Sequence, residues 1–213
     1  NNNDVFLHVD ATQIIGKKKI DLSNSYIDFV SLSGHKIYGP KGIGVAYIKA
    51  DEIGIRTKIA PLMQGGEQEY GLRPGTSAVH NIVGLGKAIE IADSNINKYY
   101  NHLQNLDKIL YDELESNIPN INFNNVQDEK IPGINNIQVP GIHNELLIKQ
   151  FKDRFSISTG SACSVGKPSH VLSAMGLNKK EIRQSLRVSF GKFNNEKQII
   201  EFVKLLKSYL SKL

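Results

Sequence analysis

The sequence contains a single cysteine, which excludes a disulfide within the chain. One thiol fits a reducing compartment, so we expect the cytoplasm, with the mitochondrial matrix as the alternative. No apolar run approaches the roughly 18–20 residues that a membrane-spanning helix needs, and we expect no membrane association. The six histidines lack zinc-ligand spacing, so we also expect no metal.

Clustered basic residues are scarce too. The net charge of +5 is spread over 213 residues, and Lys17–Lys19 is the only run of three. No aromatic residues alternate with this run, which favours a solvated turn over a direct nucleic-acid site. An initiator methionine and a signal peptide are also missing, because Asn1–Asp4 leads directly into an apolar run. We therefore interpret the sequence as lacking its front portion.

The remaining composition is that of a globular protein, with 40% hydrophobic and 22% charged residues. Three short apolar runs predict strands at Val5–Val9, Asp28–Leu32 and Gly42–Ile48. Their apolar residues do not strictly alternate with polar ones, which indicates strands covered on both faces, as in α/β proteins. Functional groups of such sheets gather at strand ends.

Helical periodicity follows this region. It predicts helices from Ala78 to about Ala92 and from about Lys98 to Leu114, the second with one stripe of leucines. We place a domain boundary near residue 95. Residues 1–95 are expected to form a mainly parallel sheet with helices, and residues 96–213 a small α+β domain.

The predicted α+β domain contains several short elements. Strands are predicted at Ile121–Phe123, Ile134–Val139, Phe155–Ser158 and Leu186–Ser189. Helices are predicted at Asn144–Lys152, Pro168–Ala174, Lys179–Ser185 and Asn195–Leu213, and Asn178 with Glu181 forms a capping pattern for the third of these.

The segment Ser33-Gly34-His35-Lys36 directly follows the second predicted strand. A lysine fixed at a strand end beside small and hydroxyl residues suits an enzyme that uses pyridoxal phosphate (PLP). Its amine must be held in place and partly desolvated to form a Schiff base with the cofactor aldehyde. A lone loop lysine is usually a solvated charge, but Asp10 and Cys163 supply two further roles.

Five motifs in order resemble the cysteine desulfurases, the NifS/IscS-like members of the class V aminotransferase superfamily. They are Asp10-Ala11-Thr12-Gln13, Ser33-Gly34-His35-Lys36, Gly39-Pro40-Lys41-Gly42, Arg73-Pro74-Gly75-Thr76 and Gly160-Ser161-Ala162-Cys163. The resemblance extends through nearly the whole chain but covers only the family's second half. It implies a partial large PLP-binding domain, followed by a small C-terminal domain that carries the cysteine loop.

The resemblance also implies residue roles around the cofactor. Lys36 is the Schiff-base lysine and then moves the substrate α-proton. Asp10 pairs with the pyridinium nitrogen, although an aspartate after a strand can instead cap a helix. Gln13 faces the phenolic oxygen of the ring. Ser33 and His35 hold the phosphate.

Three further residues have roles implied by the family. Thr76 reaches the phosphate of the neighbouring subunit's cofactor, which implies a homodimer, or is a helix N-cap. Cys163 is the nucleophile in a loop of small residues that we expect to be mobile, and the alternative is a buried inert cysteine. Arg187 binds the substrate carboxylate or makes a structural salt bridge.

The implied activity is that of a PLP-dependent cysteine desulfurase. L-cysteine yields L-alanine and a persulfide on Cys163, which passes to an acceptor such as an iron–sulfur scaffold or a tRNA-thiolation protein. The alternatives are a selenocysteine lyase or another class V enzyme, and a non-catalytic half that acts as a scaffold. The family's phosphate-cup threonine, ring-stacking histidine and substrate asparagine precede the matched region. We therefore expect weak cofactor retention by this chain alone.

Overall fold

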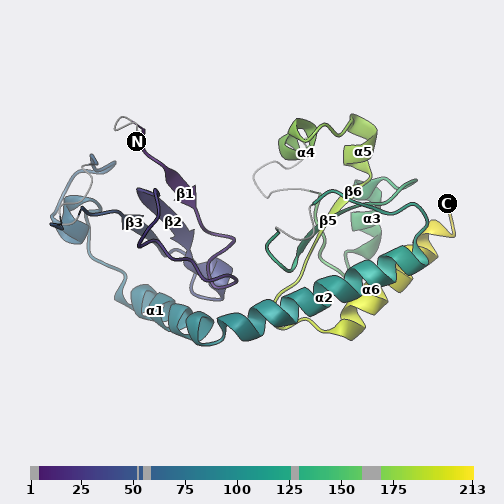
Figure 1. The fold of residues 1–213 in the computed structure, drawn as a ribbon, viewed down its shortest axis with the longest axis horizontal. Coiled ribbons are helices and arrows are strands. Elements are labelled where there is room, and N and C mark those ends of the chain that lie inside the picture. Colours follow the sequence, from purple (N-terminus) through teal and green to yellow (C-terminus); the bar gives the residue numbers. More distant parts are fainter. Residues whose placement is uncertain (1–4, 52, 55–58, 126–129, 160–168) are drawn as a thin grey trace. The chain divides into compact units, whose positions relative to one another are not determined.

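A computed structural model describes residues 5–51, 53–54, 59–125, 130–159 and 169–213 (Figure 1). The chain divides into two compact units, Asn1–Asn97 and Lys98–Leu213. The assignment of a PLP-binding role to the first unit and of the cysteine loop to the second stays a prediction.

A three-stranded sheet forms the framework of the first unit. Its strands are β1 (His8–Asp10), β2 (Phe29–Ser33) and β3 (Gly44–Ile48), in the order β1-β2-β3. The α/β class is confirmed. The expected parallel pairing holds between β1 and β2, whereas β3 runs antiparallel to β2 because only a short connection separates them.

The first strand begins later than the sequence predicted. The Leu7 carbonyl accepts hydrogen bonds from the backbone amides of both Asp28 (3.0 Å) and Phe29 (3.1 Å). The Leu7 amide donates to the Asp28 carboxylate at 2.8 Å. These bonds tie Leu7 to the entrance of β2, and the regular ladder starts at His8.

A 3-10 helix, η1 (Gly34–Ile37), follows β2 without a break. The long helix α1 (Val79–Ser94) covers it, and Ile37, Leu85 and Ala88 form the small core of this unit. A Cβ at Gly34 would lie 3.1 Å from both the Ile43 side chain and the Pro40 carbonyl oxygen. The absence of a side chain at position 34 therefore lets this turn pack tightly before Lys36.

Two long helices form where the periodicity predicted them. Asn95 separates α1 from α2 (Ile96–Asn117) and has backbone angles of φ −118° and ψ 10°.

Before α1, the short turn Gln68–Gly71 contains two non-glycine residues with positive φ, Glu69 and Tyr70.

The second unit contains a fully antiparallel sheet in the order β4-β5-β6. Its strands are Asn122–Phe123, Ile134–Gln138 and Ser185–Ser189. Its described residues also form the helices α3 (Asn144–Phe151), α4 (His170–Ala174), α5 (Lys179–Arg183) and α6 (Glu196–Leu210). The predicted cap is confirmed, because Asn178 and Glu181 form a complete capping box at α5.

The core of the second unit lies between its sheet and the helices α2 and α6, which lie side by side in Figure 1. Fully buried residues of α2 (Leu106, Leu110 and Leu114) belong to the same cluster as Val203 and Leu206 of α6. His102 contacts the Asn194 carbonyl at 3.0 Å, and Lys207 donates to the Asn117 side chain at 3.0 Å. The two helices therefore run in the same direction.

The predicted strand Phe155–Ser158 is wrong. Only Ser158 pairs, through an isolated antiparallel bridge to Arg187 with N···O distances of 2.6 and 3.2 Å. The apolar side chains of this segment, Phe155 and Ile157, instead pack against the core. Burial thus accounts for the apolar pattern without a regular ladder.

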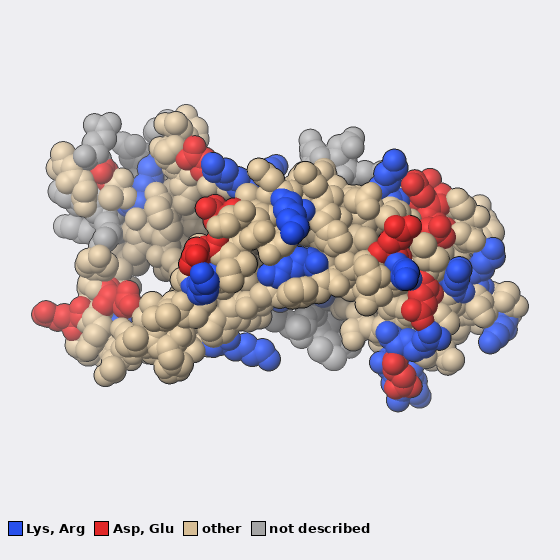
Figure 2. All heavy atoms as spheres, turned by 90° about the horizontal axis from the view of Figure 1, so that it is seen from below, with Lys and Arg blue, Asp and Glu red and all other residues tan. Residues whose placement is uncertain are grey.

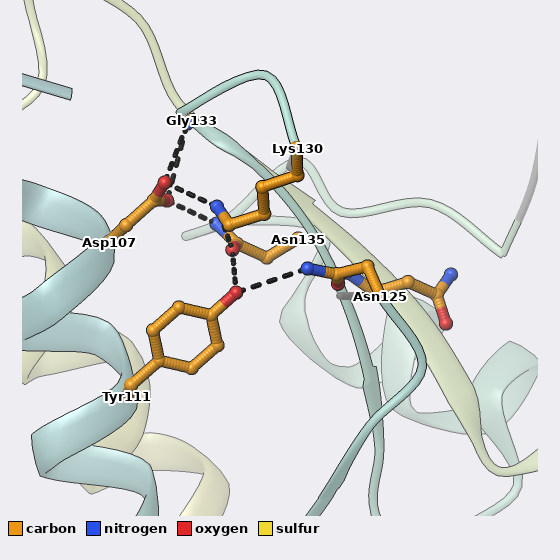
Figure 3. Close-up of polar contacts among 7 residues, drawn as sticks. Asp107, Tyr111, Asn125, Lys130, Gly133 and Asn135 are labelled. Atoms are coloured by element: carbon orange, nitrogen blue, oxygen red, sulfur yellow. Dashed lines mark hydrogen bonds and ion pairs between the residues drawn. The ribbon is translucent and has the colours of Figure 1, made fainter. Parts of the chain in front are cut away.

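A buried polar network joins α2 to the loop before β5 (Figure 3). The Asp107 carboxylate accepts hydrogen bonds from Asn135 Nδ2 (2.7 Å) and the Gly133 amide (3.1 Å), and it pairs with Lys130. The Tyr111 hydroxyl donates to Asn135 Oδ1 at 2.7 Å. Burial, opposed by a hydrogen bond from Asn125, raises the pKa of Tyr111.

We predict that Asp107→Asn destabilises the chain by about 3 kcal/mol, because it leaves the Lys130 ammonium, only 11% exposed, without its anionic partner. Urea unfolding followed by circular dichroism measures the change. Asp112→Asn, on the exposed side of the same helix, is the matched control and should change stability by less than about 0.5 kcal/mol. Equal effects of the two substitutions would contradict a structural role for the network.

Candidate active site

The parallel pairing of β1 and β2 brings the predicted cofactor residues to one end of the first sheet, where both strands finish. Asp10 is the last residue of β1 and lies opposite Ser31. Ser33 is the last residue of β2, and His35 and Lys36 follow in η1. Because the carboxyl ends of parallel strands coincide, the residues that carry the carboxylate and the amine follow the same end of the sheet.

The Asp10 carboxylate is held in its charged form. Its Oδ1 atom accepts a hydrogen bond from the Thr12 amide at 2.9 Å. Hydrogen bonds from the Thr12 hydroxyl and then its amide, together with the charge of His8, lower the pKa of Asp10. The carboxylate accepts this bond within the turn that follows β1, and residues 11–18 form turns and no helix, so the helix-cap alternative for Asp10 is wrong.

Two side chains of the Ser33–Lys36 segment face solvent. His35 and Lys36 are exposed, while their neighbours Gly34 and Ile37 are buried and anchor the turn. Gln13 is also exposed and lies in the turn after Asp10. The motif thus combines a fixed backbone with accessible donor groups.

Lys17 lies in the turn after β1, in the basic run for which we expected a solvated turn. It is half-buried, and burial together with the positive charge of Lys36 lowers its pKa. Gly16 directly precedes it and packs against Ile37, since a Cβ at Gly16 would lie 2.9 Å from the Ile37 side chain. Lys17 and Lys36 are therefore close enough to repel each other, a proximity that the basic run did not reveal.

Thr76 is exposed and lies in the loop before α1. The N-cap of α1 is Ala78 and makes no side-chain hydrogen bond, so the N-cap interpretation of Thr76 is wrong. The loop is braced instead by Gln68, whose Oε1 accepts from the Gly75 amide at 3.1 Å.

Arg187 is half-buried in the middle of β6, opposite Asn136 of β5, in the second unit. The salt bridges among the described residues do not include it. The structural ion pair that was the alternative for Arg187 is thus not seen in this part of the chain. Cys163, the predicted nucleophile, lies outside the described residues.

One face of the molecule has mixed charge. Lys and Arg are interspersed with Asp and Glu on the face in Figure 2. No His, Asp, Glu or Cys cluster suited to a metal ion occurs among the residues that the structure describes. No helix in the described ranges has the length and apolar character that crossing a bilayer requires.

Comparison with known proteins defines the family. The aminotransferase class V family model matches residues 1–202, and the chain belongs to this family. It is 39% identical over 211 residues to the cysteine desulfurase IscS of Pseudoalteromonas translucida, which covers 98% of this chain and 51% of the relative. IscS of Buchnera aphidicola subsp. Acyrthosiphon pisum is 40% identical over 214 residues, covering 100% of this chain and 52% of the relative.

Solved structures agree with this assignment. A NifS-like protein superimposes with a TM-score of 0.87 at 31% identity, over 100% of this chain and 54% of the other. A NifS-like protein from Rickettsia africae gives a TM-score of 0.82 at 28% identity, over 97% and 54%. The chain thus spans about half the length of the curated relatives it matches.

We predict that Thr12→Val raises the pKa of the Asp10 carboxyl towards its ordinary value, because the hydroxyl donor is lost while the backbone amide remains. Titration of the carboxyl carbons by NMR measures this pKa. Ser23→Ala is the matched control, because Ser23 donates in the same way to Asp21 and should raise the pKa of Asp21 alone. An unchanged Asp10 pKa in Thr12→Val would contradict the hydrogen bond.

Proposed function

We propose that this chain forms the second half of a PLP-dependent cysteine desulfurase. The observation that supports the proposal is that β1 and β2 are parallel, so Asp10 at the end of β1 and Lys36 in the turn after β2 follow the same end of the sheet. The identity to IscS proteins over nearly the whole chain supports the same activity.

The donor groups at this edge fit PLP. The charged Asp10 carboxylate suits a pyridinium nitrogen, and Gln13 offers an amide to the phenolic oxygen. Ser33 and His35 offer hydroxyl and imidazole donors to the phosphate. When bound, the cofactor supplies an electron sink for the carbanion at the substrate Cα.

The residues of this chain then have separate tasks. Lys36 holds the cofactor and afterwards, as a neutral amine, takes the proton from the substrate Cα. The planar guanidinium of Arg187 binds the substrate carboxylate by two parallel hydrogen bonds. The Cys163 thiolate attacks the substrate sulfur: the S–S bond forms, the Cβ–S bond breaks, and its electron pair stays with the carbon skeleton, which leaves as alanine after protonation.

Further features of the proposal follow from the family resemblance. The persulfide on Cys163 passes to an acceptor protein for iron–sulfur cluster assembly or tRNA thiolation. Thr76 reaches the cofactor of a second subunit, so the active enzyme is a cytoplasmic homodimer. The second candidate function, a selenocysteine lyase, shares the same lysine and aspartate, and parallel assays with L-cysteine and L-selenocysteine separate the two.

We predict that PLP added to this chain labels Lys36, weakly because half of the family's length is missing. Borohydride reduction followed by peptide mass spectrometry measures the label. Lys36→Ala should remove it, whereas Lys41→Ala, which changes an exposed lysine in the next motif, should keep it. Absence of label on Lys36 in the unaltered chain would favour a non-catalytic scaffold.

We also predict that Cys163→Ala in the uninterrupted parent polypeptide lowers alanine formation from L-cysteine by about 100-fold or more, because the attacking thiolate is lost. Alanine and sulfide are measured together by chromatography and a colorimetric assay. Ser164→Ala, the adjacent substitution, should keep the activity within about threefold. Full sulfide release by Cys163→Ala would exclude the proposed persulfide step.

A further inference from the structure

Asn136 of β5 and Arg187 of β6 are close neighbours on one face of the second sheet. The Arg187 amide and carbonyl both bond to Ser158, at 2.6 and 3.2 Å, so they point away from β5. Asn136 and Arg187 are therefore opposite each other without a backbone hydrogen bond between them, the pairing with the closer Cα–Cα approach of about 4.5 Å. Asn135 contacts Asp107 of α2, so the pair projects from the other face of the sheet.

A chain of hydrogen bonds fixes which end of the Asn136 amide is left over. The Ser185 hydroxyl donates to the Glu181 carbonyl at 2.8 Å, so its oxygen accepts from Asn124 Nδ2, which is 2.9 Å away. The same Nδ2 atom donates to Asn136 Oδ1 at 2.7 Å. Because a backbone carbonyl can only accept, every donor along this chain is determined. The oxygen of Asn136 is thus used, and its Nδ2 donor remains.

The two side chains have donors without acceptors. In the described part of the chain, no hydrogen bond uses Asn136 Nδ2 or the Arg187 guanidinium, and no ion pair includes Arg187. Both side chains are half-buried. They cannot satisfy each other, since a guanidinium and an amide nitrogen only donate. An acceptor has to come from a ligand, and an anion makes the strongest bonds with such donors.

We propose that Asn136 binds the substrate carboxylate together with Arg187. The inference rests on the proposed function, in which Arg187 binds this carboxylate. A carboxylate offers about four lone-pair positions, and the two parallel bonds from an arginine use two of them. Asn136 Nδ2 donates to a third. The pair of donors thereby selects a carboxylate over a carboxamide, whose own nitrogen is a donor and cannot accept from either side chain.

Asn136→Asp tests the free nitrogen alone. The variant keeps Oδ1, which still accepts from Asn124, and replaces the donor by an anionic oxygen that pairs with Arg187. Equilibrium dialysis measures the Kd of L-alanine, a ligand that needs no sulfur chemistry, for the parent polypeptide supplied with PLP. We expect the Kd to rise about 100-fold, because two carboxylates then compete for one guanidinium. The Kd of L-alaninamide should change less than about threefold, since its nitrogen can donate to the new oxygen.

Gln138→Glu is the matched control. Gln138 lies on the same face of β5 as Asn136 but is opposite Ser185, and the substitution adds the same charge. It should change the Kd of L-alanine by less than about threefold, because diagonal neighbours in a sheet are about 7–8 Å apart and solvent screens their charges.

Asn136→Ala is the second variant, for the case that circular dichroism shows Asn136→Asp to be unfolded. It removes the donor without adding a charge, and the Kd of L-alanine should rise about tenfold, the loss expected for one hydrogen bond to a charged group. An unchanged Kd of L-alanine in both Asn136 variants would overturn the proposal. Equal effects of Asn136→Asp and Gln138→Glu, equal effects on L-alanine and its amide, or no binding of L-alanine by the unaltered polypeptide would overturn it too.

The binding measurement separates this proposal from the desulfurase activity. A polypeptide that shows the expected Kd changes but forms alanine from neither L-cysteine nor L-selenocysteine supports the role of Asn136 and rejects the desulfurase. Alanine formation from L-cysteine by the unaltered polypeptide, combined with an unchanged Kd of L-alanine in the Asn136 variants, rejects the role of Asn136 alone.

Discussion

The parallel pairing of β1 with β2 is the constraint on which the candidate site depends. The Ala11 amide donates to the Ser31 carbonyl at 2.8 Å and carries the pairing one residue past the end of β1. Both strands therefore finish at the same edge, where Asp10 and the Ser33–Lys36 segment follow. An antiparallel arrangement of the same two strands would place the carboxylate and the amine at opposite edges, and a shared ring could not join them.

Stability is distributed unevenly along the chain. The second unit encloses a continuous core between its antiparallel sheet and α2 and α6. The core of the first unit consists of Ile37, Leu85 and Ala88, with Ile15 and Ile43 packed at its margin. Local opening is easiest where few apolar contacts must break. Lys36 thus belongs to the unit with the smaller core, where local opening is expected to be easier. Arg187 belongs to β6, whose neighbouring residues Leu186 and Val188 are part of the larger core.

Local patterns predicted the long elements well, because a strong period of 3.6 residues in α2 and α6 reflects a single buried face. The capping box at Asn178 and the lysine motif after β2 were likewise encoded by adjacent residues. Contacts between residues that are distant in the sequence could not be predicted from such local patterns. The half-buried position of Lys17 beside Lys36, the network around Asp107, and the packing of Phe155 without a strand all depend on partners that are remote in sequence.

The common direction of α2 and α6 has an electrostatic consequence. The peptide dipoles of two adjacent helices that run the same way add up, and the partial negative charges of both C-terminal ends gather at one end of the unit. Lys207 lies in the last turn of α6 and donates its ammonium hydrogen to Asn117 at the end of α2, so one cation offsets both helix ends. Rising ionic strength weakens this compensation and should loosen the final turns of both helices together.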